Sequence, residues 1–254
     1  MLVVISPAKK LDWTEKNVEM TQPVFQAEAH ELAEVARGLS HDELKSLMHL
    51  SDDLTTLNAD RFKAFTDTPE PEDLRPAALA FAGDTYQGLE AGTLDADEMR
   101  FADDHLRILS GLYGVLKPRD GFQAYRLEMG SRLKTAQGKN LYDYWGDKIA
   151  AQLKAEADIL GTDTLVNCAS QEYFGAVPPK ALGLRIITPQ FLEDKPGGPK
   201  IVSFYAKRAR GSMARFIIQH RLNDADALKD FDFGGYSYQP ELSTPDKPAF
   251  LRAG

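Results

Sequence analysis

Residues 204–215 carry the strongest chemical signal in the sequence, because four cations lie within nine residues beside two aromatic side chains. We expect a strand to end near Ala206 and a helix to begin at Gly211 and Ser212, since glycine allows a sharp turn and serine caps helices. A helix N-terminus favours anions, and lysine and arginine add charge and bidentate hydrogen bonds. The junction is therefore predicted to bind phosphate, with an exposed basic edge as the alternative. The cations are Lys207, Arg208, Arg210 and Arg215.

Two other segments place cations where elements end. In Ser6-Pro-Ala-Lys9 a lysine follows a predicted strand, from which it could reach a phosphate, although the glycines of a nucleotide-triphosphate loop are missing. Residues 105–119 indicate a helix end followed by a hairpin, in which Gly111 and Gly114 leave backbone N–H groups free for an anion. The alternatives are a solvated lysine and an ordinary glycine at a helix end. The cations in and after this hairpin are Arg107, Lys117, Arg119 and Arg126.

Two carboxylates lie in apolar surroundings and could serve as acid and base. Glu128 belongs to Tyr125-Arg-Leu-Glu-Met-Gly130, and Glu172 to Asn167-Cys-Ala-Ser-Gln-Glu-Tyr173. Glu172 follows a predicted strand end, a common position for ligand groups. If partly buried, it could exchange protons with a substrate, paired with Glu128 or Tyr173, while Asn167 positions the substrate. The alternative is a structural hydrogen-bond network.

The remaining composition excludes several classes of protein. No histidine or cysteine pair has the spacing of a metal site, so no metal and no cofactor is predicted. The lone cysteine, Cys168, excludes a disulfide scaffold, fits a reducing cytoplasm and is expected to be a small buried residue. No apolar run approaches the roughly 18 residues of a membrane span. The apolar start, Met1-Leu-Val-Val-Ile5, is too short for the core of a signal peptide, and Lys9 and Lys10 follow it instead of preceding it. We therefore expect a cytoplasmic protein without a membrane partner.

Charge is divided unevenly along the chain. The net charge is −8, but residues 1–104 hold 22 acidic and 9 basic residues, whereas residues 105–254 hold 16 acidic and 21 basic residues. Two stretches are poor in acids: residues 107–139 have seven Lys/Arg and two acids, and residues 195–223 have seven Lys/Arg and none. If these stretches share one face, they could bind a polyanion; otherwise they form solvated surfaces.

The elements that must position these residues indicate an α+β fold, with a mixed sheet, surrounding helices, a helical acidic N-terminal half and a basic cleft. Ser40 with Glu43, and Asp95 with Glu98, form capping boxes, and Ser51 begins another helix. Residues 184–192 and 199–206 flank a Pro-Gly-Gly-Pro turn, which predicts an antiparallel hairpin. Helices are expected at 24–38, after Ser40, and at 51–65, 95–109, 140–155 and 224–231, and strands at 2–5, 164–169 and 249–252.

Length and composition fit a globular chain rather than a disordered one. The 254 residues are 43% hydrophobic and 27% charged. This length fits a single domain, residues 1–254, or a domain made of a helical lobe at about 20–110 and a mixed α/β lobe at about 111–236.

Six motifs occur in a fixed order along the chain. Together they resemble the YaaA family of peroxide stress resistance proteins, from residue 1 to about residue 236. The motifs are Ser6-Pro-Ala-Lys9, Phe81-Ala-Gly-Asp-Thr-Tyr-Gln-Gly88, Leu106-Arg-Ile-Leu-Ser-Gly-Leu-Tyr-Gly-Val-Leu-Lys-Pro118, Tyr125-Arg-Leu-Glu-Met-Gly130, Tyr142-Asp-Tyr-Trp-Gly146 and Phe204-Tyr-Ala-Lys-Arg-Ala-Arg-Gly211.

The resemblance implies a bacterial, cytoplasmic DNA-binding protein of the response to oxidative stress by hydrogen peroxide, which limits free intracellular iron. It also implies a positively charged cleft, a helix-hairpin-helix element and a preference for distorted or branched duplexes. Two segments compete for the hairpin element: residues 105–119, and the helix pair at 40–65, which lacks a glycine turn. With one cysteine and no haem signature, any role against peroxide is expected to be indirect.

Two functional hypotheses follow, and a scaffold that binds RNA or an acidic protein is a third. In the first, the protein binds DNA and reads its shape, such as a bulge or branch, rather than its sequence. In the second, an enzyme of nucleobase or nucleoside hydrolase type acts on a nucleotide, nucleoside or damaged base, with Glu172 or Glu128 as acid/base and Tyr173 or Asn167 positioning the base. In the first hypothesis one cleft is lined by Arg107, Lys117, Arg119, Arg126, Lys207, Arg208, Arg210 and Arg215, joined by Lys9.

Overall fold

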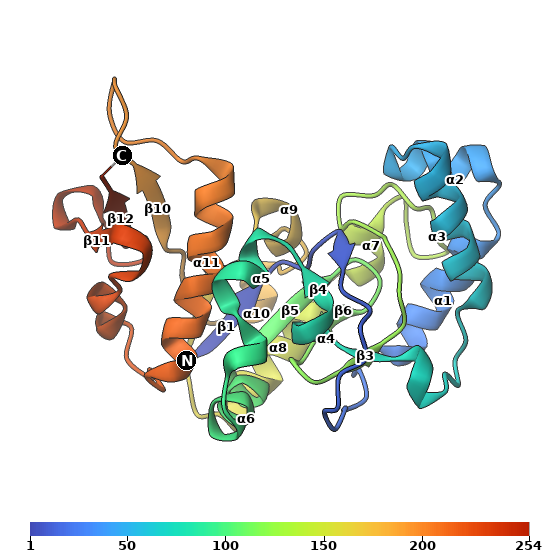
Figure 1. Cartoon of the computed structure of the whole chain (residues 1–254), viewed down its shortest axis with the longest axis horizontal. Helices are drawn as coiled ribbons and strands as arrows, with labels where there is room; N and C mark the ends of the chain where they lie inside the picture. Colours follow the sequence, from blue (N-terminus) through green and yellow to red (C-terminus); the bar gives the residue numbers. More distant parts are fainter. Residues whose placement is uncertain (254) are drawn as a thin grey trace.

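The computed structural model describes residues 1–253 and is built around a five-stranded sheet (Figure 1). The strand order is β6-β5-β1-β8-β9. β1 (Leu2–Ile5) lies in the centre, parallel to β5 (Leu106–Ser110) on one side and to β8 (Thr164–Cys168) on the other. β9 (Arg185–Ile187) is parallel to β8, whereas β6 (Gly114–Leu116) returns antiparallel to β5. The mixed sheet with its helices confirms the predicted α+β fold.

The central strands are buried, which explains their nearly unbroken apolar sequences. Every residue of β1, β5 and β8 is buried, as expected for parallel strands covered on both faces. α11 (Ser203–Gln219) packs against β1 and β8, and α6 (Ala96–His105) leads directly into β5. α8 (Lys148–Ile159) is joined to β5 by an ion pair between Glu156 and Arg107.

Helix α11 crosses α5 (Asp84–Leu89) at very short range, and two glycines make this approach possible. A Cβ atom at Gly211 would lie 1.7 Å from the backbone oxygen of Thr85, and one at Gly88 would lie 2.0 Å from the backbone oxygen of Arg208. Neither distance leaves room for a side chain. The two helices are therefore in backbone contact, and this contact fixes α11 beside the sheet.

Helix α11 begins at Ser203, so the predicted strand at 199–206 and the predicted helix start at Gly211 are wrong. The helical spacing of its apolar residues continues back through the basic segment. Only an isolated bridge between Glu193 and Lys200 remains of the predicted hairpin. The cations before Gly211 thus lie on a helix rather than at a strand end. The buried residues that carry this spacing include Ala206, Ala209, Met213 and Ile217.

Two other predicted helices have different bounds in the structure. The helix capped by Asp95 and Glu98 ends at His105 instead of near residue 109, because residues 106–110 form β5. A short apolar run fits a buried strand as well as a turn of helix, so periodicity did not separate them. The helix predicted at 140–155 is divided by Gly146, with a φ of 47°, into α7 (Leu141–Trp145) and α8.

Smaller elements complete the fold. The strand predicted at 249–252 is confirmed as β12 (Ala249–Arg252), the middle of a three-stranded sheet with β10 (Gln190–Glu193) and β11 (Tyr236–Tyr238). Two further pairs join β2 (Lys10–Leu11) to β4 (Phe81–Ala82), and β3 (Arg75–Pro76) to β7 (Gly121–Phe122). The remaining helices are α4 (Ala77–Ala80), α9 (Gln171–Phe174), α10 (Pro179–Leu182) and the 3-10 helices Pro71–Asp73, Ala91–Thr93, Asp226–Asp230, Phe233–Gly235 and Pro240–Leu242.

The predicted N-terminal helices and their caps are confirmed. α1 (Gln26–Arg37), α2 (His41–Met48) and α3 (Asp52–Ala64) form a helical lobe on the right of Figure 1. Ser40 with Glu43 and Asp95 with Glu98 form complete capping boxes, and the Ser51 side chain caps α3.

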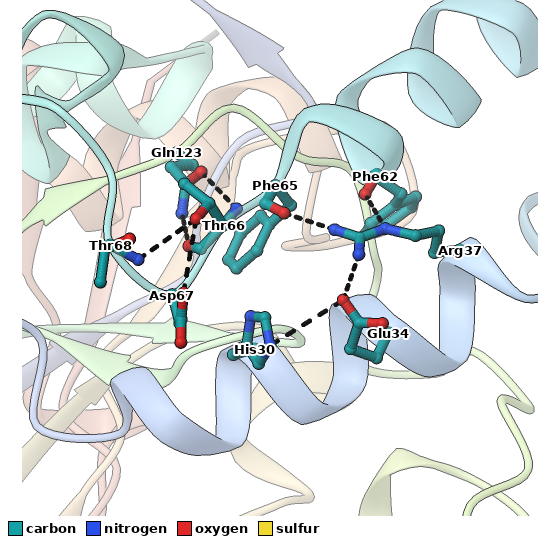
Figure 2. Close-up of polar contacts among 9 residues, drawn as sticks. All are labelled: His30, Glu34, Arg37, Phe62, Phe65, Thr66, Asp67, Thr68 and Gln123. Carbon is teal, nitrogen blue, oxygen red and sulfur yellow. Dashed lines mark hydrogen bonds and ion pairs between the residues drawn. The ribbon is translucent and has the colours of Figure 1, made fainter.

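Arg37 ties the first helix of this lobe to the end of the third (Figure 2). Its Nε donates to the backbone oxygen of Phe62 at 2.8 Å, and a terminal guanidinium nitrogen donates to that of Phe65. Just beyond α3, the backbone N–H of Thr66 donates to Gln123 Oε1 at 3.0 Å, and Gln123 Nε2 donates back to Thr66 O at 2.7 Å. Because Gln123 directly follows β7, these bonds fasten the helical lobe to the rest of the protein.

Candidate anion-binding site

A pocket of about 450 Å³ opens where β1 and β8 end. Residues 6–10 line it after β1, Cys168 and Ser170 line it at the end of β8, and Lys207 and Arg210 of α11 contribute another part of its lining. β5 lies on one side of β1 and β8 on the other, so the strand order changes direction at β1. Open α/β sheets bind ligands at such a point, outside the carboxyl ends of the strands.

Serine and tyrosine hydroxyls fix the two strand ends that form this pocket. The backbone N–H of Ser170 donates to Ser6 Oγ at 2.8 Å, which joins the segment after β8 to the segment after β1. Tyr86 of α5 donates from its hydroxyl to the backbone oxygen of Ser6 at 3.1 Å. Ser170 also caps α9 by accepting from the backbone N–H of Tyr173. The pocket is therefore built on backbone held by three elements.

Four cations reach the pocket: Lys9, Lys10, Lys207 and Arg210. Lys207 and Arg210 are three residues apart on α11, so they lie on neighbouring turns of one helix face. Neither side chain makes an ion pair or hydrogen bond within residues 1–253, whereas Lys9 Nζ lies 2.6 Å from Glu128 Oε1. The two α11 cations are thus available to an anion.

Carboxylates and buried phenols line another part of the pocket. The backbone N–H of Gly130 donates to Glu172 Oε1 at 3.0 Å, which brings the segment of Glu128 against α9. Burial raises the pKa of Tyr173 well above its usual value, and the nearby charges of Glu172 and Glu128 raise it further. Tyr173 therefore stays a neutral phenol beside two acceptor groups. Asp84 is a third acid of the lining.

Cys168 is confirmed as a small buried residue, although one part of it lines the pocket. Burial raises the pKa of its thiol to about 12, against a smaller lowering by the charge of Arg210. Because the thiolate is the reactive form of cysteine, this side chain is chemically inert at neutral pH.

Three of the cations proposed from the sequence serve contacts inside the protein. Arg107 has a side chain only 3% exposed and donates from Nε to Glu156 Oε2 at 2.6 Å. Arg119 pairs with Asp103. Arg215 donates to the backbone oxygens of Leu89 and Glu90 and to Thr93 Oγ1, which fastens α11 to the segment after α5. The structure places none of the three in the pocket lining.

The other candidates do not line the pocket. Arg208 is exposed on α11, and Lys117 is exposed in the turn after β6. Arg126 is mostly buried, with Nη2 at 3.3 Å from Glu128 Oε1. Asn167 is buried in β8, where its Oδ1 accepts from the backbone N–H of Ala169. Of the four acid/base candidates, Glu128, Glu172 and Tyr173 meet in the pocket and Asn167 does not.

The hairpin predicted within 105–119 is present as the β-hairpin of β5 and β6, whereas the binding of an anion there stays a prediction. A Cβ atom at Gly111 would lie 2.3 Å from the backbone oxygen of Leu127, and one at Gly114 would lie 2.7 Å from Trp145. Close packing therefore accounts for both glycines. The competing helix pair, α2 and α3, exposes the acids Asp42, Asp52 and Asp53, which repel phosphate.

Sequence reasoning gave no role to Tyr86, Asp84 or Lys10, which the structure brings to the pocket. Tyr86 and Asp84 belong to the motif at 81–88, whose chemistry is inconspicuous when read alone. The signal in the sequence that could have indicated them is a pair of glycines inside helices, Gly88 and Gly211. No local turn requires a glycine at either position. Only the crossing of α5 and α11 explains both residues.

The motifs that carry the family resemblance converge on this pocket. Four of the six contribute residues to its lining, namely those at 6–9, 81–88, 125–130 and 204–211. A fifth supports it, because the Tyr142 hydroxyl donates to the backbone oxygen of Glu172 at 2.9 Å. Segments about 200 residues apart in the sequence thus form or support the same pocket.

Residues 1–253 contain neither a metal-ligand cluster nor a helix suited to cross a membrane. The structure contains no group of three or more His, Cys, Asp or Glu side chains arranged to hold a metal ion within these residues. Over the same range, no helix combines the length and the apolar character needed to cross a membrane.

Comparison with known proteins gives matches along almost the whole chain. The UPF0246 proteins of Roseobacter denitrificans and Ruegeria pomeroyi are 68% and 67% identical to it, each over 99% of this chain and 98% of the relative. The UPF0246 protein of Caulobacter vibrioides is 53% identical over 99% of both chains. The family described as peroxide stress protein YaaA matches residues 1–242. The resemblance seen in the six motifs is therefore confirmed, and the chain belongs to the YaaA family of peroxide stress proteins.

Proposed function

We propose that this protein binds DNA through a basic face of α11 during the response to hydrogen peroxide. Lys207, Arg208 and Arg210, called the α11 basic face, lie in the first half of the helix, with Lys207 and Arg210 in the pocket lining and Arg208 exposed outside it. None of the three side chains forms an ion pair within residues 1–253, and no acid occurs in residues 195–223. Unpaired cations on one helix are suited to bind successive phosphates. This cluster is the observation that carries the proposal.

An exposed aromatic side chain beside this face favours DNA with unstacked bases. Phe204 is 50% exposed on the turn of α11 before the cations, whereas the ring of Tyr205, 37% exposed, already has the Arg252 guanidinium over it at 3.9 Å. Aromatic rings stack on single bases, and a bulge or branch offers such bases where a continuous duplex does not. The acidic first part of the chain repels phosphate and would orient DNA towards α11. Recognition of DNA shape therefore suits this surface better than reading of base sequence.

The proposed role in the peroxide response is indirect. A cysteine reacts with peroxide as its thiolate, and burial raises the pKa of the Cys168 thiol to about 12. Binding to distorted DNA in the cytoplasm would act on the target of oxidative damage instead of on the oxidant. Membership of the family supports the role in the stress response, and the α11 basic face supports nucleic acid as the binding partner.

Replacing the whole α11 basic face by alanine is expected to weaken DNA binding in a salt-dependent way. The triple variant Lys207→Ala, Arg208→Ala, Arg210→Ala removes three phosphate contacts, so the slope of log affinity against log salt should fall by about 3. The measurement is fluorescence anisotropy with a bulged duplex, a four-way junction and a plain duplex across a salt series. The wild-type protein should prefer the bulged and branched DNA.

A matched control removes three cations elsewhere. Lys63, Arg100 and Lys154 are exposed and already paired with acids on their own helices. Their alanine variant changes net charge equally, yet should keep the slope. If both variants lose the same amount of DNA affinity, the effect is one of net charge alone. If the slope of the α11 variant is unchanged, this face does not bind DNA.

The variant Phe204→Ala tests the preference for unstacked bases separately. Stacking of one base on an aromatic ring contributes about 1–3 kcal/mol, so affinity for bulged DNA should fall at least about fivefold. Affinity for the plain duplex should stay the same, because Phe204 carries no charge. Equal losses on both DNAs would show that the ring supports α11 instead of stacking on a base.

A further inference from the structure

The pocket beside α11 contains two kinds of binding group that do not neutralise each other. Lys207 and Arg210 come from α11, whereas Glu128 and Glu172 come from the segments before and after α8. No ion pair joins either α11 cation to either carboxylate, although all four side chains line one pocket. A ligand that satisfies this pocket must be anionic at one end and rich in hydrogen-bond donors at the other.

We propose that the pocket binds one nucleoside monophosphate unit, with its phosphate on Lys207 and Arg210 and its sugar and base towards Glu128 and Glu172. A phosphate supplies the negatively charged partner that Lys207 and Arg210 lack within the protein. Sugar hydroxyls and base N–H groups donate hydrogen bonds, and carboxylates only accept them. A bare polyphosphate would meet the acids Asp84, Glu128 and Glu172 and be repelled. The source is either a free nucleotide or an unstacked nucleotide of a DNA strand.

Size and apolar surface agree with this ligand. The volume of about 450 Å³ lies within the range of pockets that enclose small molecules and cannot admit a duplex. Tyr86 and Tyr173 line it, and burial keeps the pKa of both phenols well above the usual value. The lining thus includes neutral aromatic side chains next to the carboxylates, which suits a base better than a second charged group.

Lys9 gives the pocket a movable cation. Its ammonium pairs with Glu128 at 2.6 Å, while its side chain is 66% exposed. A long exposed side chain can turn from the carboxylate to a phosphate at little cost. Entry of the nucleotide would then release Glu128 to accept from the ligand. When Lys9 exchanges its ion pair with Glu128 for the phosphate, binding of the phosphate frees the carboxylate that binds the sugar or base.

Calorimetric titration of the full chain tests the proposal. The probes are the four deoxynucleoside 5′-monophosphates, deoxyadenosine, deoxyribose 5-phosphate and inorganic phosphate. At least one monophosphate should bind about tenfold more tightly than each of the three fragments, because only the whole unit engages both parts of the pocket. Phosphate binding as tightly as every nucleotide, or no nucleotide binding at millimolar concentration, would overturn the proposal.

Variants assign the two ends of the site. Arg210→Ala should weaken the nucleotide about tenfold and leave deoxyadenosine unchanged, whereas Glu172→Gln should weaken both. The glutamine still accepts from the N–H of Gly130, so the local fold is kept. Lys207→Ala replaces Arg210→Ala if that variant unfolds. Arg221→Ala removes the same charge just after α11 and should change nothing; losses as large in this control as in Arg210→Ala would overturn the assignment.

Competition with bulged DNA identifies the source of the nucleotide. If the ligand is an unstacked nucleotide of DNA, bulged DNA displaces the monophosphate, and Glu172→Gln weakens binding of bulged DNA but not of duplex. If the ligand is free nucleotide, Glu172→Gln leaves DNA binding intact. The inference does not rest on the proposed DNA binding, because nucleotide titration without DNA succeeds or fails by itself.

Discussion

Gly211→Ala is expected to destabilise the protein by at least about 3 kcal/mol, against the usual effect of alanine in a helix. In the middle of an ordinary helix this change stabilises by about 1 kcal/mol. Here the added Cβ would lie 1.7 Å from Thr85 O, 2.7 Å from Thr85 C and 2.9 Å from the backbone nitrogen of Leu89. All three atoms are backbone of α5, so no side chain can turn aside. The two helices would have to separate.

Urea denaturation of the variant and the wild type measures this loss. Gly92→Ala is the matched control, because its Cβ would meet only Leu79 Cδ2, at 4.0 Å. The control should stay within about 0.5 kcal/mol of the wild type, the usual range for an unconstrained surface change. An alanine at 211 that stabilises the protein would mean that α5 and α11 do not cross as described.

The same variant should lose ligand binding even where it remains folded. Tyr86 of α5 and Arg210 of α11 line the pocket from the two helices that the substitution separates. DNA and nucleotide titrations at a temperature where Gly211→Ala is still folded by circular dichroism measure this. Full binding by a folded Gly211→Ala protein would show that the pocket tolerates the displacement.

Arg107→Ala is expected to cost about 3–5 kcal/mol, the range for breaking a buried ion pair from one side. The side chains of Arg107 and Glu156 are 3% and 11% exposed, so removal of the arginine leaves a carboxylate in a nearly dry site. The arginine also donates from Nη1 to the backbone oxygens of Asp103 and Leu106 at 2.7 Å, and these would lose their partner. Chemical denaturation measures the loss.

A double variant separates the charge from the packing. Arg107→Met with Glu156→Leu removes both charges and keeps apolar volume, so it should recover most of the stability that Arg107→Ala loses. DNA affinity, corrected for the folded fraction, should be unchanged in both variants, because the guanidinium is buried. A loss below about 1 kcal/mol in Arg107→Ala would show that the pair is solvated.

Local signals in the sequence predicted the elements that depend on local interactions. The capping boxes at Ser40 and Asp95 bond within four residues, and the apolar strand at 2–5 has no competing interpretation. The failures have different causes. Residues 106–110 become a strand because β1 pairs with them, which is a non-local interaction. Residues 203–210 carry a helical spacing of apolar side chains, but the turn residues before them and Gly211 after them favour a strand and a later helix start.

The candidate site was predicted in its chemistry but not in its geometry. Glu128, Glu172 and Tyr173 were paired from the sequence, and the structure brings them together. The cations were chosen by charge alone, which cannot separate a buried Arg107 from an available Arg210. The difference lies in Glu156, 49 residues further along the chain, which the sequence does not connect to Arg107. Burial of a charge depends on a partner that only the fold supplies.

The central place of β1 also sets the order in which the protein can fold on the ribosome. β1 is made first, but its neighbours in the sheet begin at residues 106 and 164. At about 5–20 residues per second, the second neighbour follows on the order of ten seconds later. Until then the nascent chain carries an apolar Leu-Val-Val-Ile segment without its partners in the sheet. The sheet therefore closes late in synthesis, and β1 is the segment that chaperones for apolar nascent segments would hold.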